Sequence, residues 1–295
     1  MNELFKSIKS LNVLKISSII FFIVSLVIFW HLSLKKFFKF EGRIERSVEK
    51  MYDKDDLSSC CLFKGNYINF GYWKDELDET PISLEQRIES QKNLYHLVLN
   101  NLNISHNDNV LEVGCGLGVG TVLVSNDYKP KKIMAIDISK AQINRAKKIN
   151  YKNIDNDKIL FEVGNAENLS FQNSSFDIIF SIEAAQHFHS IDKFIDESYR
   201  VLNPSGKIAV ASFFGTSKKS VSKLSNRIQT IKTGIDHVRP IDEIQRKFKK
   251  AGFVNIKISN IGKNVWSGFD RWAAQGELKN SWTRNWYYGY KHNLV

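Results

Sequence analysis

The stretch at 109–123, NVLEVGCGLGVGTVL, decides the fold. Its first five residues form a short apolar run rich in branched side chains, which predicts a buried β-strand. Four glycines follow at alternate positions, at Gly114, Gly116, Gly118 and Gly120. Glycine is favoured where the backbone turns sharply or approaches a ligand closely, because it has no Cβ atom. A glycine-rich turn between a strand and a helix therefore predicts a ligand site, with a tight turn that binds nothing as the alternative.

Similar strand-like runs continue along the chain and alternate with helical segments. Strands are expected at 132–136, 158–163, 176–182, 207–214 and 254–259, and helices at 139–149, 191–202 and 242–251. This alternation implies right-handed crossovers and a mostly parallel sheet with helices on both faces. The sequence predicts a doubly wound α/β domain at 106–295 with a cap at 215–250. A helical lid segment at 41–105 precedes it.

The residues around the glycine turn narrow the class of ligand, because ligands of such sheets bind beyond the carboxyl ends of the strands. A dinucleotide fingerprint needs GxGxxG, and Thr121 stands where the third glycine would follow Gly116. A phosphate-binding loop needs a lysine, and none occurs between Val110 and Tyr128. Asp137 ends the second predicted strand, where a carboxylate can accept hydrogen bonds from both hydroxyls of a ribose. Helix capping is the alternative role of Asp137.

Together these motifs resemble those of the Rossmann-like S-adenosylmethionine-dependent methyltransferases. The shared features are ExGxGxG at 112–118, the acid that ends the second strand, and GNAENL at 164–169. More narrowly, NYINFGYW at 66–73, IEAAQHF at 182–188 and RVLNPSG at 200–206 are similar to small-molecule O- and C-methyltransferases. Enzymes of that branch act on macrolide sugars, phthiotriol-type lipids, tocopherols and sterols. The resemblance covers roughly residues 66–286.

The resemblance implies S-adenosylmethionine as the cofactor and a role for individual residues. The amino acid and ribose end of the cofactor would be lined by Glu112, Gly114, Gly116 and Gly118. Asp137 would hold the ribose hydroxyls, Ile138 would pack on the adenine, and Asn165 and Ala166 would meet the adenine edge. The family usually has aspartate at position 165. Asparagine accepts a hydrogen bond without a charge, so this departure bears on cofactor affinity.

The family also closes an amino-terminal lid over the cofactor. The candidates for lid contacts are Tyr67, Tyr72, Trp73 and Gln91. Ordinary core packing is the alternative role for these aromatic residues.

Methyl transfer needs an in-line approach of the acceptor, and positioning supplies much of the rate. His187 follows the fourth strand and resembles the position of the base in related O-methyltransferases, with packing as its alternative role. Imidazole titrates in the range that a base requires. Glu183, at the tip of the same strand, is a candidate to orient the substrate or to bind the methionine amine. Ser212 stands near the place where related sugar O-methyltransferases carry an aspartate. This weakens the case for a His–Asp pair and leaves catalysis by proximity open.

Residues 16–34, ISSIIFFIVSLVIFWHLSL, form an uncharged apolar stretch. As a helix it would be about 28 Å long, close to the thickness of a hydrocarbon core. Lys35 and Lys36 follow it instead of a small-residue cleavage site, so a single-pass anchor at 1–40 is favoured over a cleaved signal peptide or a buried helix. Lysine and arginine are more numerous on its carboxyl side, which predicts a catalytic domain that faces the cytoplasm. Unpaired Cys60, Cys61 and Cys115 agree with a reducing compartment.

The net charge of +11 favours anionic surfaces. Part of it belongs to the basic segment beside the predicted span, and lysines in the cap are expected to be solvated helix faces. Basic stripes interleaved with aromatic residues are not visible, so nucleic acid is not an expected partner. Three cysteines without a CxxC pair do not predict a metal site. No oligomeric state follows from the sequence.

The sequence as a whole predicts a membrane-anchored methyltransferase acting on the hydroxyl or carbon of a small, lipophilic acceptor. The alternative is a catalytically silent cofactor-binding scaffold of the same fold, favoured by Asn165, Ser212 and the carboxyl end of the chain. A nicotinamide-dependent oxidoreductase conflicts with the glycine spacing. After 254–259 no credible last strand is visible. This predicts either a carboxyl-terminal truncation or an irregular segment in place of that strand.

Overall fold

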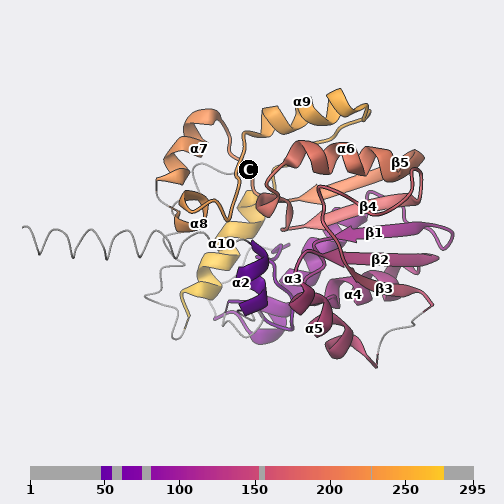
Figure 1. The fold of residues 1–295 in the computed structure, drawn as a ribbon. Coiled ribbons are helices and arrows are strands. Elements are labelled where there is room, and N and C mark those ends of the chain that lie inside the picture. Colours follow the sequence, from indigo (N-terminus) through magenta and orange to yellow (C-terminus); the bar gives the residue numbers. More distant parts are fainter. Residues whose placement is uncertain (1–47, 55–61, 75–80, 153–156, 227, 276–295) are drawn as a thin grey trace, which may run out of the picture. The chain divides into compact units, whose positions relative to one another are not determined.

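Five parallel strands form one sheet in the part of the chain that the computed structural model describes, namely residues 48–54, 62–74, 81–152, 157–226 and 228–275 (Figure 1). The strands are β1 (Asn109–Val113), β2 (Lys132–Asp137), β3 (Ile159–Val163), β4 (Phe176–Ile182) and β5 (Leu202–Ala211). Their order is β3-β2-β1-β4-β5. The order reverses between β1 and β4, which is where ligands of open α/β sheets bind.

Helices cover both faces of this sheet (Figure 1). One face carries α3 (Leu84–Leu99), α4 (Val119–Tyr128) and α5 (Lys140–Asn150), and the other carries α6 (Ile191–Val201) and α9 (Ile241–Ala251). Successive strand residues serve opposite faces. In β1, Val110 packs into the core on the α3 side, whereas Leu111 packs into the core on the α6 side. The predicted doubly wound α/β architecture is confirmed.

The helices begin and end where local signals place them. Ser83 caps α3 and forms a capping box with Gln86, while Ser139 and Ser190 cap α5 and α6. These side chains accept hydrogen bonds from backbone N–H groups that lack a partner inside the helix. Gly252 ends α9 in the left-handed conformation, as its position in the sequence predicts.

The cap region divides between two packing partners. The helices α7 (Lys218–Ser225), α8 (Gln229–Lys232) and α10 (Gly262–Ala273) surround an aromatic cluster that includes Phe70, Phe213, Trp266 and Phe269. By contrast, α9 packs against α6 on the face of the sheet. Of the helices in the predicted cap, α7 and α8 therefore share a core with the loop at 62–74, which carries Phe70 and which we call the lid loop.

The strand predicted at 254–259 is wrong, because the structure assigns no strand to these residues. Asn255 has a φ of 55°, a left-handed conformation that interrupts an extended chain. Val254 is 80% exposed, so this segment has no apolar face to bury against the sheet. The β5 strand also begins earlier than predicted, since Leu202 pairs with Phe176 before an irregularity in the ladder.

Two predictions fall on residues outside the described part. The membrane span at 16–34 and the missing last strand, which concerns 276–295, both stay predictions. Among the described residues, no helix combines the length and apolar character that a bilayer crossing requires.

Candidate functional site

The glycine turn after β1 forms one wall of the site. The N–H groups of Gly114 and Cys115 donate to the carbonyl oxygen of Ile136, which ties the turn to the neighbouring strand. A Cβ atom at Gly114 would lie 2.3 Å from Cβ of Ala184, so no larger residue fits there. At Gly116 the nearest atom to such a Cβ would be 3.8 Å away. The backbone at Gly116 is therefore not crowded, and it lines the pocket, where a ligand can approach it closely.

A pocket opens at this turn and encloses about 890 Å³ of non-atom space, including its open mouth. It lies beyond the carboxyl ends of β1, β2, β3 and β4. Nine of the residues predicted for the site line it, namely Tyr67, Gly114, Gly116, Asp137, Ile138, Asn165, Ala166, Glu183 and His187. Residues predicted from separate motifs are thus brought to one cavity.

The carboxylate of Asp137 is held in a fixed position at the end of β2. Its Oδ2 accepts from the N–H of Gly116 at 3.0 Å, and its Oδ1 accepts from the N–H of Ser139 at 2.9 Å. Burial raises the pKa of Asp137, and these two hydrogen bonds oppose the rise. Each oxygen keeps lone-pair capacity for a ribose hydroxyl. Ile138, which is 40% exposed, offers an apolar surface beside it.

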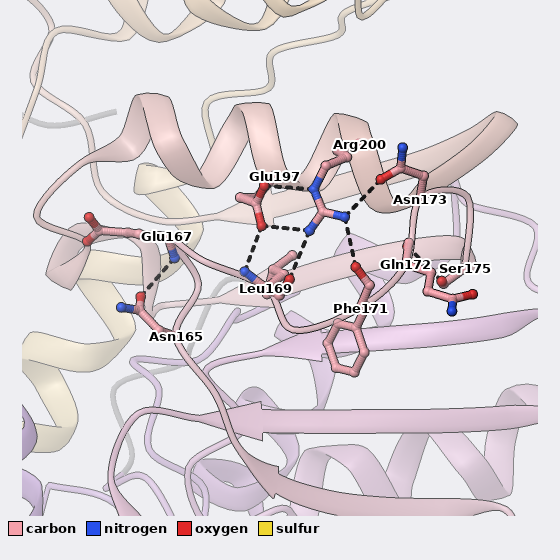
Figure 2. Close-up of polar contacts among 9 residues, drawn as sticks. All are labelled: Asn165, Glu167, Leu169, Phe171, Gln172, Asn173, Ser175, Glu197 and Arg200. Atoms are coloured by element: carbon pink, nitrogen blue, oxygen red, sulfur yellow. Dashed lines mark hydrogen bonds and ion pairs between the residues drawn. The ribbon is translucent and has the colours of Figure 1, made fainter.

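The loop after β3 is fixed by a pair of charged residues on α6 (Figure 2). Arg200 donates to the carbonyl oxygens of Leu169 and Phe171, and Glu197 accepts from the N–H of Leu169. Glu197 also pairs with Arg200. Asn165, on the same loop, accepts from the N–H of Glu167 at 2.8 Å. The side-chain oxygen of Asn165, a residue that lines the pocket, thus already accepts one hydrogen bond.

His187 stands in a short helical turn, η2 (Ala185–His187), after β4 and is surrounded by groups of defined polarity. Its Nδ1 lies 2.9 Å from Oδ1 of Asp236 and 3.2 Å from the carbonyl oxygen of Ile235. On the other side, Nε2 lies 3.2 Å from the hydroxyl of Tyr52 and 3.3 Å from Nε2 of Gln186. The oxygens near Nδ1 can accept a hydrogen bond from the ring, whereas the amide NH₂ and the hydroxyl near Nε2 can donate one to it.

These partners determine the tautomer of His187. The hydroxyl of Ser212 donates to Oε1 of Gln186, so the amide NH₂ of Gln186 is the group that faces His187. The proton is therefore assigned to Nδ1, and Nε2 keeps a lone pair. Burial lowers the pKa of His187, but the Asp236 carboxylate and the Ile235 carbonyl outweigh it, so the pKa lies above its ordinary value.

Glu183 occupies a strained position at the tip of β4. Its φ of 49° is unusual for a residue with a side chain. Its Oε2 accepts from the N–H of Phe70 at 2.8 Å, which joins the sheet to the lid loop. Burial raises the pKa of Glu183 to about 8, against the opposing effects of the Phe70 N–H, Arg87 and His187. Burial thus favours the uncharged form of this carboxyl group.

The buried Arg87 holds the other end of that lid loop. Its guanidinium donates to the carbonyl oxygens of Leu62, Asn69 and Phe70. The Phe70 backbone is therefore hydrogen-bonded on one side to a cation and on the other to Glu183. This arrangement fixes the loop that presents Tyr67 to the pocket.

Two predicted residues from the glycine motif lie behind the lining. Glu112 is 1% exposed and accepts hydrogen bonds from the hydroxyls of Tyr95 and Thr121. Burial raises its pKa to about 7. A Cβ atom on Gly118 would lie 2.4 Å from the ring of Phe161, so this glycine allows α4 to approach the sheet. Both residues shape the wall of the pocket from behind.

Three predicted lid residues also lie outside the lining. Gln91 donates to the carbonyl oxygens of Tyr67 and Lys64, and so holds the loop that carries Tyr67. The backbone N–H of Trp73 donates to the carbonyl oxygen of Asn264 in α10, and the side-chain amide of Asn264 donates to the carbonyl oxygen of Trp73. Tyr72 packs between two apolar clusters. Core packing, the alternative that the sequence left open for the aromatic residues, describes the placement of Tyr72 and Trp73, whereas Gln91 supports the loop.

Two residues of the site were missed from the sequence. Tyr52 belongs to α2 (Val48–Lys54), lines the pocket and reaches His187. Asp236 lies in the cap and supplies the carboxylate that was not expected near His187. The His–Asp pair that the sequence disfavoured is therefore present in the structure. No local signal marks either residue, because both reach the site only through tertiary packing.

Helix α2 is fastened to the amino-terminal end of α5. The hydroxyl of Ser139 donates to Oδ1 of Asp53 at 2.6 Å, and Arg145 donates to the carbonyl oxygen of Tyr52 at 2.8 Å. Ser139 also bonds Asp137 through its N–H. One residue thus connects the strand-end carboxylate with the helix that lies over the pocket.

Comparison with known proteins adds a family to this geometry. Residues 111–210 match the family model described as a methyltransferase domain. The chain is 27% identical over 244 residues to erythromycin 3''-O-methyltransferase of Saccharopolyspora erythraea, covering 79% of this chain and 78% of that protein. It is 31% identical over 153 residues to phthiotriol/phenolphthiotriol dimycocerosates methyltransferase of Mycobacterium leprae, covering 52% and 55%.

Among solved structures, the fold is similar to geranyl diphosphate C-methyltransferase from Streptomyces coelicolor A3(2), solved with Mg²⁺, geranyl diphosphate and S-adenosyl-L-homocysteine. The TM-score is 0.68 at 13% identity, and the match covers 84% of this chain and 93% of that one. The bare backbone at Gly116, the fixed carboxylate of Asp137 and the exposed apolar side chain of Ile138 fit the ribose and adenine of such a nucleoside.

Proposed function

Because the chain belongs to the small-molecule branch of the S-adenosylmethionine-dependent methyltransferases, we propose that it methylates a hydroxyl group of a small, lipophilic acceptor. The observation that carries this proposal is the Nε2 lone pair of His187, in the wall of the pocket next to Tyr52. A base at this place serves an acceptor that must lose a proton, as a hydroxyl does. Relatives named for phthiotriol dimycocerosates and geranyl diphosphate support a lipophilic acceptor.

The proposal includes a single membrane anchor at 16–34, with the catalytic domain in the cytoplasm. The uncharged length of that stretch and the basic residues after it support this placement. An anchored enzyme would meet a lipophilic acceptor where such molecules concentrate.

The residues of the site divide into those that bind and those that move a proton. The cofactor supplies an electrophilic methyl group when it is bound. The backbone around Gly116 and the carboxylate of Asp137 hold its ribose, and Ile138 packs on its base. His187 receives the acceptor proton at Nε2 as the acceptor oxygen is methylated. Asp236 then stabilises the imidazolium, because its carboxylate lies 2.9 Å from Nδ1.

The hydroxyl of Tyr52 lies against the lone pair of His187 that receives the acceptor proton. Burial raises the pKa of the Tyr52 hydroxyl far above its ordinary value, so the group stays neutral and donates to Nε2 of His187. An acceptor hydroxyl must take the place of this donor or share the lone pair with it. The hydroxyl of Tyr52 thus marks where an acceptor oxygen can bind.

The test of the proposal is mass spectrometry of a membrane extract incubated with full-length protein and S-adenosylmethionine labelled in its methyl group. We expect a lipid-soluble product that gains one labelled methyl on oxygen, with an equal amount of S-adenosylhomocysteine. Extract treated with the His187→Ala variant is the control. Label found only on carbon or nitrogen, or no labelled product from protein that binds the cofactor, would contradict the proposal.

Replacing Asp236 by asparagine is expected to move the pH dependence of turnover. In the parent protein the raised pKa of His187 makes kcat/KM rise with pH on a limb above the ordinary value for imidazole. Replacing Asp236 takes away the carboxylate that raises the pKa of His187, while burial still lowers this pKa. The limb therefore shifts to lower pH. A pH–rate profile measures the shift.

The matched control is Asp127→Asn. It removes the carboxylate from a second His–Asp pair, in which Oδ2 of Asp127 lies 3.4 Å from Nε2 of His96, outside the pocket lining. This change should leave the limb where it is. An unmoved limb in the Asp236 variant would show that another group is the base.

Replacing Arg145 by alanine is expected to speed release of S-adenosylmethionine by up to about thirtyfold. The change removes the hydrogen bonds to the carbonyl oxygens of Tyr52 and Asp53 that hold α2 over the pocket, and each such bond contributes about 1 kcal/mol. Stopped-flow dissociation measures the rate. Arg246→Ala, which removes an exposed arginine of α9 paired with Asp242, should release the cofactor at the parent rate. If the Arg145→Ala and Arg246→Ala variants release the cofactor at the same rate, the attachment of α2 does not control cofactor release.

A further inference from the structure

The cap helices α7 and α8 carry positive charge that the described part of the chain does not balance. Residues 212–235 contain no aspartate or glutamate. Their exposed lysines, which we call the cap lysines, are Lys218, Lys219, Lys223 and Lys232. Within the described ranges, none of the four forms an ion pair with a carboxylate.

In helix α9, by contrast, two of the cations have carboxylate partners. There, Arg246 pairs with Asp242, and Lys247 pairs with Asp192. All three helices contain lysine, but only α9 also contains carboxylates, those of Asp242 and Glu243. Helices α7 and α8 therefore carry basic side chains without any acidic side chain of their own.

The apolar side chains of the same two helices point inward and leave the cap lysines outside. Leu224 and Ile228 are buried in the cluster that contains Phe213 and Trp266. Among the described residues of 218–232, the exposed ones are the cap lysines, Ser222 and Asn226. Residues 218–232 contain no aromatic side chain. Single-stranded nucleic acid is usually bound by basic grooves with stacking aromatic residues, so this surface fits an anionic plane better.

The cap is joined firmly to the wall of the pocket. Within the cap, the N–H of Gly215 donates to the carbonyl oxygen of Arg239. The N–H of His237 then joins the cap to the residue before His187, because it donates to the carbonyl oxygen of Gln186 at 2.6 Å. Asp236 meets His187 in the same stretch. The direction of the basic surface relative to the pocket is thus set by the fold.

We propose that the cap lysines dock on the anionic surface of a lipid bilayer and hold the pocket beside it. This inference goes beyond methyl transfer and rests on the proposed function for the lipophilic nature of the acceptor. Each lysine close to an anionic leaflet strengthens association about fivefold. Residues 35–47 extend at most about 45 Å, so a domain anchored at 16–34 stays near the membrane and even weak docking is populated.

The experiment is lysine acylation with mass spectrometry on full-length protein and vesicles of two compositions. One is pure phosphatidylcholine, and the other contains about 30% phosphatidylglycerol. We expect acylation of the cap lysines to fall at least threefold on the anionic vesicles and to recover in high salt, which screens surface charge. Lys249 and Lys250, exposed on α9, are the internal controls and should react equally with both.

Three outcomes would overturn the proposal. They are equal acylation of the cap lysines on both vesicles, equal protection of Lys249 and Lys250, and protection by a nucleic acid duplex instead of anionic vesicles. The triple variant Lys218→Gln, Lys219→Gln, Lys223→Gln should lose the protection at Lys232 and keep the parent affinity for S-adenosylhomocysteine. A parent protein that does not bind S-adenosylhomocysteine would instead count against the proposed function.

Discussion

Replacing Asp137 by alanine is expected to weaken binding of S-adenosylmethionine at least about a hundredfold. Hydrogen bonds to a charged group contribute about 1.5–3 kcal/mol each, and the ribose offers two hydroxyls to this carboxylate. The variant also frees the N–H groups of Gly116 and Ser139 that Asp137 now satisfies, so the glycine turn loses its support. Isothermal titration with S-adenosylhomocysteine measures the affinity without any acceptor.

A matched control separates this effect from general damage to the sheet. Asp177 is also a strand aspartate, and it accepts from the N–H of Asn109 and from the side chain of Asn203 near the start of β4. Asp177→Ala should lower the melting temperature and leave the affinity unchanged. Asp137→Asn, which keeps one carbonyl acceptor, should fall between alanine and the parent. Parent-like affinity in Asp137→Ala would remove this residue from the cofactor site.

Replacing His187 by alanine is expected to lower kcat by about 10²–10⁴-fold, the usual contribution of a general base. The expected loss is in turnover alone, because the cofactor contacts proposed for Asp137 and Ile138 do not involve the imidazole. Turnover is measured with the acceptor that the labelling experiment identifies, and cofactor affinity by titration. His189→Ala is the control, since His189 is exposed and does not line the pocket.

Two results would change the assignment of the base. Parent-like turnover in His187→Ala would mean that positioning alone drives the reaction. A fall in cofactor affinity equal to the fall in turnover would assign His187 a binding role. Because Tyr52 and Gln186 both face Nε2, the Tyr52→Phe variant can report separately on the donor that covers the lone pair.

The sequence predicts the sheet well because strands and helices depend on local patterns. The run NVLEV at 109–113 alternates between two cores, and the structure places β1 at those residues. Ser139 and Ser190 mark helix starts through their own hydroxyls. The segment at 254–259 has the composition of a strand, but Asn255 turns left-handed and Val254 is exposed. Composition alone does not supply the neighbouring strand that such a segment must pair with.

Placement in a motif and contact with a ligand are different properties. Gly116 and Gly118 are adjacent members of one motif, yet a Cβ atom at Gly116 would lie no closer than 3.8 Å to its neighbours, whereas one at Gly118 would lie 2.4 Å from the ring of Phe161. Glu112 belongs to the same motif and is covered by Tyr95 and Thr121. Sequence spacing specifies the turn, whereas the packing of α3 and α4 on the sheet decides which members face the pocket.

By itself the sequence determined the parallel sheet, the bare turn at Gly116 and the carboxylate of Asp137 at the end of a strand. These features are local, since each depends on residues close together in the chain. The surroundings of His187 were decided only by the tertiary structure. Tyr52 comes from α2 and Asp236 from the cap, and both meet the imidazole because helices far apart in sequence pack over the same strand ends. Hydrogen bonds between such distant segments leave no periodic pattern in the chain, so only the folded arrangement reveals them.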